Sequence, residues 1–156
     1  MAATQSVDEA RTRAGGRSAR RRARELALQG VYEWLVGGQD VAAIESHLME
    51  SDSFDKADRE HLREVLHGVI ADASALRAHF TAFIDRRPEH LSPVEHGILL
   101  IGTYELLKRP EIPYRVVINE AVELAKSFGG TEGFRYVNGV LDKVAAQLRP
   151  HEAQRR

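Results

Sequence analysis

Apolar residues recur at steps of three and four along this chain, and this period constrains the fold more than any other feature. It places Leu62, Val65, Leu66 and Val69 on one face of a helix, and the pattern continues to Ile84. No stretch alternates apolar and polar residues between turn signals, as a half-buried strand does. The sequence therefore predicts an all-α protein of six or seven helices with short connections.

Local start and stop signals place several of these helices. Asp40 is predicted to cap a short helix, since its side-chain oxygen can accept from a free N–H group of the first turn. Ser92 and Pro93 are typical of another helix start, with proline at the first helical position. Residues 98–101 are consecutive apolar residues, which predicts a central helix. The long helix before it is predicted to break near Asp72.

The last two helices carry polar residues within their apolar stripes. One helix is predicted between Pro113 and Gly129, with its stripe facing inward as far as Phe128. Asn119 of this helix and Asn138 of the next interrupt the apolar pattern. We expect them to form satisfied polar links that fix the helix register, with ligand contacts as the alternative.

Composition divides the chain into four segments. Residues 1–16 carry almost no large apolar side chain and end in two glycines, which predicts a disordered tail. A polar turn at 86–91 is the predicted seam between two helical groups. The expected organisation is a tail over 1–16, an N-terminal helical bundle over 17–86, a C-terminal helical bundle over 87–150 and a tail over 151–156.

The charge of the chain is distributed unevenly. Its formal net charge is -1, yet residues 1–24 hold seven arginines against Asp8 and Glu9. A basic arm on a mildly acidic body favours a polyanionic partner at one end. A transit peptide is an alternative for such a start, but the two acidic residues and the direct run of arginines into a helix weaken it.

Several classes of protein are excluded by what the chain lacks. Cysteine is absent, which excludes disulfides, thiolate metal sites and cysteine nucleophiles. No apolar run approaches the ~20 residues that cross a bilayer, and no secretory signal is found. We therefore expect a soluble protein, and the absence of cysteine fits a cytoplasmic location.

Motifs that carry catalysis are also missing. The chain has no phosphate-cradling glycine loop, zinc-protease motif or nucleophile elbow. His61 and Glu64 share a helix face and can ligate a metal, so a helical metalloenzyme is an alternative hypothesis. A di-iron bundle needs a second such motif and further glutamates. The sequence therefore predicts a protein that is not an enzyme and has no cofactor or metal.

Arginines crowd the first predicted helix. At about 100° per residue, Arg17, Arg20, Arg21 and Arg24 fall within one sector, and this sector is apolar further along, over residues 28–35. Like charges at this spacing cost roughly a few tenths of a kcal/mol each, and their sign opposes the helix dipole. We expect the helix to dock by its C-terminal half and to project these guanidinium groups toward phosphate. A solvated basic face without a dedicated partner is the alternative.

RNA suits this arm better than duplex DNA does. The chain shows no helix-turn-helix with a recognition helix, and an arginine arm beside exposed aromatic rings fits unstacked bases. Tyr32 and Tyr136 are the candidate stacking surfaces. Ordinary packing with the hydroxyl at the surface is the alternative for each ring.

Three stretches of the chain carry a specific likeness to a known family. They are RRRARELALQGVYEW at 20–34, LSPVEHGILLIGTYELLKR at 91–109 and PYRVVINEAVELAKSFGGTEGFRYVNGVLDKVA at 113–145. Over about residues 18–150 the chain resembles the NusB family of bacterial transcription antitermination factors. The resemblance implies two packed three-helix bundles, no enzymatic activity, and binding of boxA RNA as a heterodimer with NusE, a small-subunit ribosomal protein. It further implies indirect contact with the RNA polymerase elongation complex and a role in ribosomal RNA transcription.

The resemblance also implies site residues. It places RNA contacts at the arginine-rich start of the first helix, at an aromatic residue of that helix and at the start of the last helix. Glu95 falls on the surface that the family uses for NusE. Some members form homodimers, and a NusB-like domain precedes some ribosomal RNA cytosine methyltransferases, so a free-standing RNA-docking module is an alternative. The implied RNA-binding residues are Arg20, Arg21, Arg22, Arg24, Tyr32, Glu132, Arg135 and Tyr136.

Overall fold

The structure, a computed structural model, describes residues 2–153, with side chains from residue 19 onward. Over this range it contains helices and no strand, which confirms the all-α prediction. No helix in this part of the chain is long and apolar enough to cross a membrane. The α-helices described are α1 (Ala2–Gly37), α2 (Val41–Leu48), α3 (Arg59–Phe80), α4 (Pro93–Lys108), α5 (Tyr114–Phe128), α6 (Gly133–Leu148) and α7 (Pro150–Ala153), and 3-10 turns cover Phe54–Lys56, Thr81–Phe83 and Pro88–His90.

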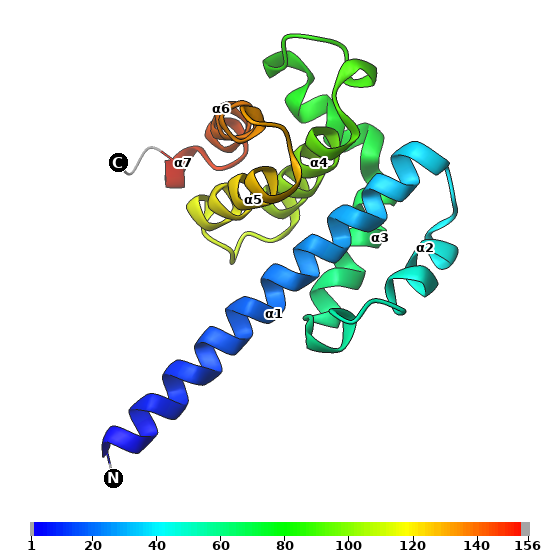
Figure 1. The fold of residues 1–156 in the computed structure, drawn as a ribbon. Helices are drawn as coiled ribbons and strands as arrows, with labels where there is room; N and C mark the ends of the chain where they lie inside the picture. The colour runs from blue at the N-terminus through cyan, green and yellow to red at the C-terminus, as the bar shows by residue number, and fades with distance from the viewer. Residues whose placement is uncertain (1, 154–156) are drawn as a thin grey trace.

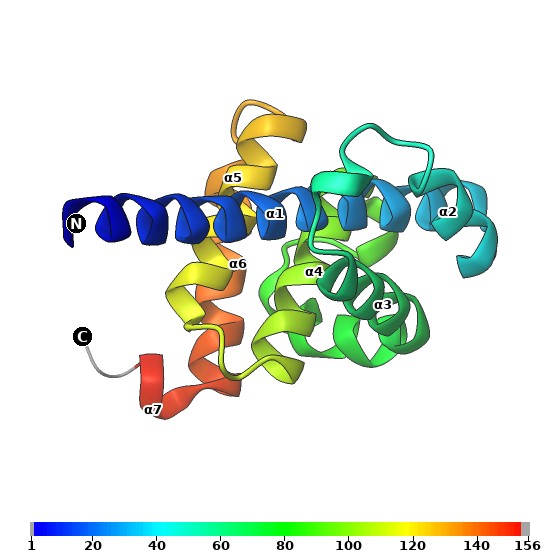
Figure 2. The same cartoon turned by 90° about the horizontal axis from the view of Figure 1, so that it is seen from below.

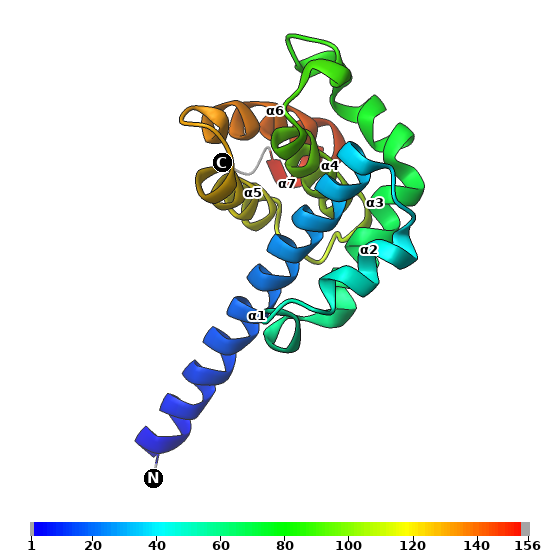
Figure 3. The same ribbon diagram turned by 45° about the vertical axis from the view of Figure 1, so that its right-hand side comes forward.

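The helices form two packed groups of three, α1–α3 and α4–α6. Helix α1 crosses the molecule and packs against α3 on one side and α4 on the other, as Figures 1 and 3 show. Figure 2 shows the same helix from below, lying across the two groups. Helix α4 contacts α1, α3, α5 and α6, so that every residue from 96 to 106 is buried. The sequence prediction of a central helix at this position is confirmed.

Local capping determines several helix boundaries, as the sequence predicted. Asp40 accepts a hydrogen bond from the backbone N–H of Ala43 at 2.9 Å and caps α2. Ser92 accepts one from the N–H of Glu95 at 3.1 Å and caps α4. Helix α3 is kinked at Asp72, whose φ of -111° and ψ of 16° are not helical. These contacts act within four residues, which is why the sequence reveals them.

The start of α1 differs from the prediction. The sequence predicted a disordered tail over residues 1–16, whereas the backbone is helical from Ala2 and extends beyond the two groups in Figure 1. Two glycines cost a helix only about 1 kcal/mol each relative to alanine, and most of the neighbouring residues are good helix formers. The helix also docks earlier than predicted, because the carbonyl of Ala19 accepts from the N–H of Asp58 at 2.9 Å and Ala23 is fully buried.

Helix α5 also corrects two expectations. Phe128 was predicted to face inward, but it is 51% exposed because the buried face of α5 ends at Ala125. Asn119 and Asn138 were expected to be internal polar links. Both are exposed, on the solvent side of α5 and α6, so they do not fix the packing of these helices from within.

Candidate nucleic-acid interface

Arg24 is an internal residue of the fold. Only 4% of it is exposed, and its Nε donates to both carboxylate oxygens of Glu105, at 3.0 and 3.1 Å. Glu105 lies in the centre of α4 and is 1% exposed. The prediction that the arginine tip lies clear of the protein interior is therefore wrong for Arg24, because this side of α1 faces α4 rather than solvent.

Glu105 also accepts a hydrogen bond from His61 of α3. The distance from His61 Nε2 to Glu105 Oε2 is 2.6 Å. Burial alone raises the pKa of Glu105, but the hydrogen bond from His61 and the charge of Arg24 outweigh it and hold that pKa below its usual value. A buried carboxylate with two such donors links α1, α3 and α4.

The same contacts argue against the metal-site hypothesis for His61 and Glu64. The Nδ1 atom of His61 lies 3.3 Å from Arg109 Nη1, so both ring nitrogens have protein partners. Glu64 pairs with Arg109 as well. Within the described part of the chain no three histidine, aspartate or glutamate side chains are grouped to hold a metal ion.

Arg20 and Arg21 are paired at the surface. Arg20 Nη2 lies 3.3 Å from Asp58 Oδ2, and Arg21 donates from Nε and Nη2 to the two oxygens of Glu120 at 3.1 and 3.0 Å. The hydrogen bonds to Glu120 and its negative charge raise the pKa of Arg21. The side chain of Arg21 is nevertheless 53% exposed. A further ligand can therefore reach its guanidinium group.

The predicted arginine sector is thus divided. Arg24 belongs to the interior, and Arg20 and Arg21 carry acidic partners at the surface. Arg22 is half-buried, and no hydrogen bond or ion pair joins it to another side chain described in the structure. Arg17 lies on α1, but its side chain falls outside the described residues. Arg21 and Arg22 are consequently the arginines best placed to meet an anionic partner.

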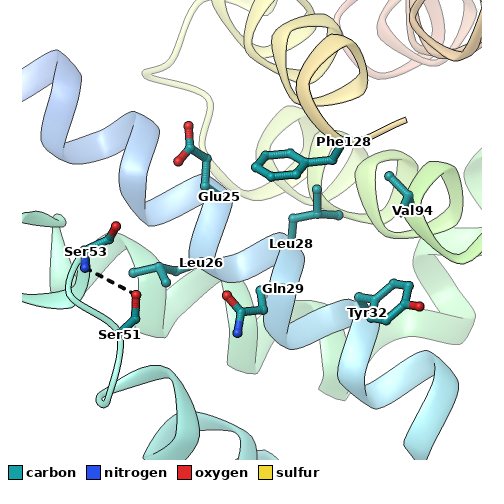
Figure 4. Close-up of a pocket in the computed structure, with 9 residues that line it drawn as sticks. All are labelled: Glu25, Leu26, Leu28, Gln29, Tyr32, Ser51, Ser53, Val94 and Phe128. Atoms are coloured by element: carbon teal, nitrogen blue, oxygen red, sulfur yellow. Dashed lines mark hydrogen bonds between the residues drawn. The ribbon is translucent and has the colours of Figure 1, made fainter. Parts of the chain in front are cut away.

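An apolar pocket lies next to these arginines, one turn further along α1. It has a volume of about 300 Å³ and is lined by α1, by the loop after α2, by α4 and by the end of α5. In Figure 4, Leu28 lies among Glu25, Phe128 and Tyr32, and Val94 of α4 lies to the right of Phe128. The rings of Tyr32 and Phe128 are 41% and 51% exposed. The pocket therefore offers two aromatic surfaces beside an arginine pair.

Glu95 lies where α4 meets the start of α6. A Cβ atom at Gly133 would be only 2.8 Å from Glu95 Oε1, so the glycine allows this carboxylate to approach the N-terminal end of α6. The partial positive charge at a helix N-terminus stabilises an anion there. Glu95 also follows Val94, which lines the apolar pocket. The position predicted for the protein partner therefore adjoins that pocket.

The remaining predicted residues lie at the first turn of α6. Glu132 and Arg135 form an exposed ion pair at 3.4 Å. The half-buried Tyr136 donates from its hydroxyl to Asp85 at 3.0 Å, and the Arg86 guanidinium lies 5.2 Å from the centre of its ring. The hydrogen bonds from Arg86 and Tyr136 lower the pKa of Asp85 to about 2. Tyr136 is thus held by the segment between α3 and α4.

A model of the NusB family matches residues 21–146, which is most of the chain. The chain belongs to the NusB family. Its relatives include the transcription antitermination protein NusB of Bordetella pertussis, 58% identical over 91% of this chain and 95% of that protein. The transcription antitermination protein NusB of Ralstonia nicotianae is 55% identical over 98% of this chain and 99% of that protein.

Solved NusB structures have the same fold. NusB of T. maritima superimposes with a TM-score of 0.75 at 26% identity, over 85% of this chain and 94% of that one. A second neighbour, from a crystal structure of the antitermination factors NusB and NusE in complex with dsRNA, has a TM-score of 0.71 at 19% identity. It covers 81% of this chain and 96% of the other. The NusB-like arrangement of two three-helix bundles is therefore confirmed.

Sequence reasoning missed the acidic partners of the NusB-family arginines. They are Asp58, Glu105 and Glu120, and they come from three different parts of the chain. The pairing of Glu105 could have been inferred from the sequence, since it is the single charged residue in the apolar run 97–107. A charge in such a run is almost always paired when it is buried. Phe128 was missed as a surface ring because it ends an apolar stripe.

Proposed function

We propose that the chain is an RNA-binding transcription antitermination factor that binds boxA RNA together with a NusE protein. The observation that carries this proposal is the match to transcription antitermination relatives over nearly their whole length. The arrangement of exposed arginines beside an aromatic pocket supports it, because these are the two kinds of group that single-stranded RNA requires.

The arginines and the aromatic rings have different tasks in this proposal. Arg21, Arg22 and Arg17 supply attraction to phosphates, which depends on salt and not on base sequence. Tyr32 and Phe128 supply surfaces on which unstacked bases can pack. Glu132, Arg135 and Tyr136 form a second contact region at the start of α6. Arg24 is left out of the contact set because it is buried against Glu105.

Glu95, at the start of α4, is the proposed NusE contact. An acidic side chain at the surface suits a basic protein partner, since charge complementarity guides association. Through NusE the factor would act on the transcribing RNA polymerase and support ribosomal RNA transcription. The protein acts by binding and performs no catalysis in this proposal.

Near-complete coverage favours a free-standing factor over a detached methyltransferase module. The alignment spans 95% and 99% of the two antitermination relatives, so no catalytic domain is left unmatched in them. A gel-shift assay separates these functions. We expect boxA RNA to bind weakly to the protein alone and more tightly with NusE, and a scrambled RNA of equal length to gain little from NusE.

Substitution of Arg22 tests the arginine surface. R22Q should weaken RNA binding more at low salt than at high salt, because one phosphate contact is lost. The slope of log Kd against log salt concentration should decrease by about 0.7, the value for one phosphate contact with a single strand. R63Q is the matched control, since Arg63 is an exposed arginine on α3. Equal losses in R22Q and R63Q would contradict the proposed surface. The molecular mass of the particles in the same samples shows whether the protein forms a homodimer in place of the RNA complex.

A further inference from the structure

The three acidic partners of the arginine sector differ in how easily they can be displaced. Glu105 is 1% exposed and holds both Arg24 and His61. Asp58 pairs with Arg20 and also caps α3, where it accepts from the N–H of His61 at 3.1 Å. Exchange at either carboxylate would therefore disturb the fold. Glu120, by contrast, caps no helix among the described contacts, and its second contact is a longer one, 3.9 Å from Arg24 Nη1.

The pair of Arg21 and Glu120 occupies the atoms that a phosphate would use. Arg21 donates from both Nε and Nη2, so one complete edge of its guanidinium fork faces the carboxylate. Phosphate oxygens accept from the same planar fork. Because the Arg21 side chain is 53% exposed, the ion pair contributes little to folding stability and can exchange with solvent.

Glu120 also has a second cation within reach. Its Oε2 atom lies 3.9 Å from Arg24 Nη1, and the neighbouring Nη2 of Arg24 is buried without a hydrogen-bond partner. An unpaired buried donor is costly, so a carboxylate that turns toward Arg24 gains an interaction there. When Arg21 leaves Glu120, the carboxylate can therefore still interact with a cation, and Arg24 gains a partner.

We propose that Glu120 competes with RNA phosphate for Arg21 and so limits the RNA affinity of the protein. The proposal rests on RNA binding as the proposed function and adds an affinity-determining residue on α5. On binding, the phosphate takes the fork of Arg21, and Glu120 turns to Arg24. In the free protein the pair directs the Arg21 side chain toward α5 and partly neutralises its charge.

The test compares E120Q with E123Q in RNA titrations at several salt concentrations, with NusE present. Glu123 lies one turn further along α5 and pairs with Lys126, so E123Q removes the same charge, which acts on Arg21 only from a distance, without removing a hydrogen bond to Arg21. We expect E120Q to bind boxA RNA about fivefold more tightly at low salt, with a salt dependence steeper by about 0.7, as for one added phosphate contact. E123Q should change affinity by less than about twofold.

The double variant R21Q/E120Q decides whether the gain acts through Arg21. In the R21Q background, removal of the Glu120 charge should give no gain. An E120Q variant that binds no better than E123Q, or a gain that persists in R21Q/E120Q, would overturn the inference. If the unchanged protein binds no RNA with NusE present, the proposed function itself fails. Thermal melting of each variant confirms that the fold is retained.

Discussion

Arg21 and Arg24 lie three positions apart on α1, and each pairs with a glutamate of the second helical group. Their surroundings are nevertheless opposite. The side chains of Arg24 and Glu105 are 5% and 1% exposed, whereas those of Arg21 and Glu120 are 53% and 18% exposed. A buried charge must keep its partner, while an exposed one can exchange its partner for solvent or phosphate. A cluster of one residue type in the sequence is therefore not one functional unit.

Truncation of the two arginines should separate them most clearly. R24M removes the charged partner of the buried Glu105 and leaves it only the hydrogen bond from His61, so it should lower the free energy of unfolding by about 3–5 kcal/mol. R21M breaks only a surface pair and should cost less than about 1 kcal/mol. Urea unfolding measures both. Similar losses in the two variants would remove the distinction, and E105Q provides a second measurement if R24M does not fold.

The burial of His96 on α4 predicts that the stability of the protein depends on pH. Burial, followed by the charge of Arg77, lowers the pKa of His96 from 6.5 to about 4. Its Nε2 accepts from Arg77 Nε at 2.9 Å, which requires the neutral ring. The unfolded chain binds a proton below pH 6.5, but the folded protein does so only near pH 4. Stability should therefore fall as pH decreases between these values.

The expected loss is about 2 kcal/mol at pH 5 relative to pH 8, and about 3 kcal/mol when His96 is fully protonated. Urea unfolding at several pH values measures it. The other histidines titrate as well, so the test is the difference between the unchanged protein and H96Q, which has no titrating group at this position. Parallel pH profiles of the two proteins would show that the neutral ring at position 96 does not matter.

Substitution of Asp58 should cost an amount of unfolding free energy between the losses expected for the buried pair and for the exposed pair. D58A removes the cap of α3 together with the partner of Arg20, and should cost about 1–2 kcal/mol of unfolding free energy. R20M removes only the ion pair and should cost less than about 1 kcal/mol. Thermal melting under identical conditions orders the two variants. If R20M proved as damaging as D58A, the ion pair rather than the cap would hold this end of α3.

Changing the salt concentration should alter stability least, and it should distinguish the Arg21 pair from the Arg24 pair. Raising the salt concentration to about 0.5 M screens charges in water, so the small loss caused by R21M should shrink toward zero. The loss caused by R24M should persist, because its pair is shielded from solvent. Unfolding in urea at low and high salt measures both differences. A loss for R24M that disappears with salt would contradict an interior pair.

Much of the fold was predictable because the signals that define helices are local. The caps at Asp40 and Ser92 and the kink at Asp72 act within one turn, and apolar spacing marks the buried faces. Phe128 shows the limit of this reasoning. An apolar stripe does not reveal where packing against the neighbouring helix stops, so the last ring of α5 was placed inside although it is exposed.

The candidate site was predictable in its residues more than in its geometry. Arginine density and family resemblance pointed to the first helix and to the start of α6. The pairing of Arg24 with Glu105 spans 81 positions, and no local pattern encodes a contact of that length. The sequence therefore could not distinguish the arginine that faces α4 from those that face solvent. The RNA contacts themselves stay a prediction.

Helix α1 ties the two helical groups into a single unfolding unit. Ala23 and Ala27 are fully buried where α1 packs between α3 and α4. Because this one helix completes the interior on both sides, neither half keeps a closed core once the other has opened. The molecule should therefore melt in one transition, and the arginine face exists only while the whole chain is folded.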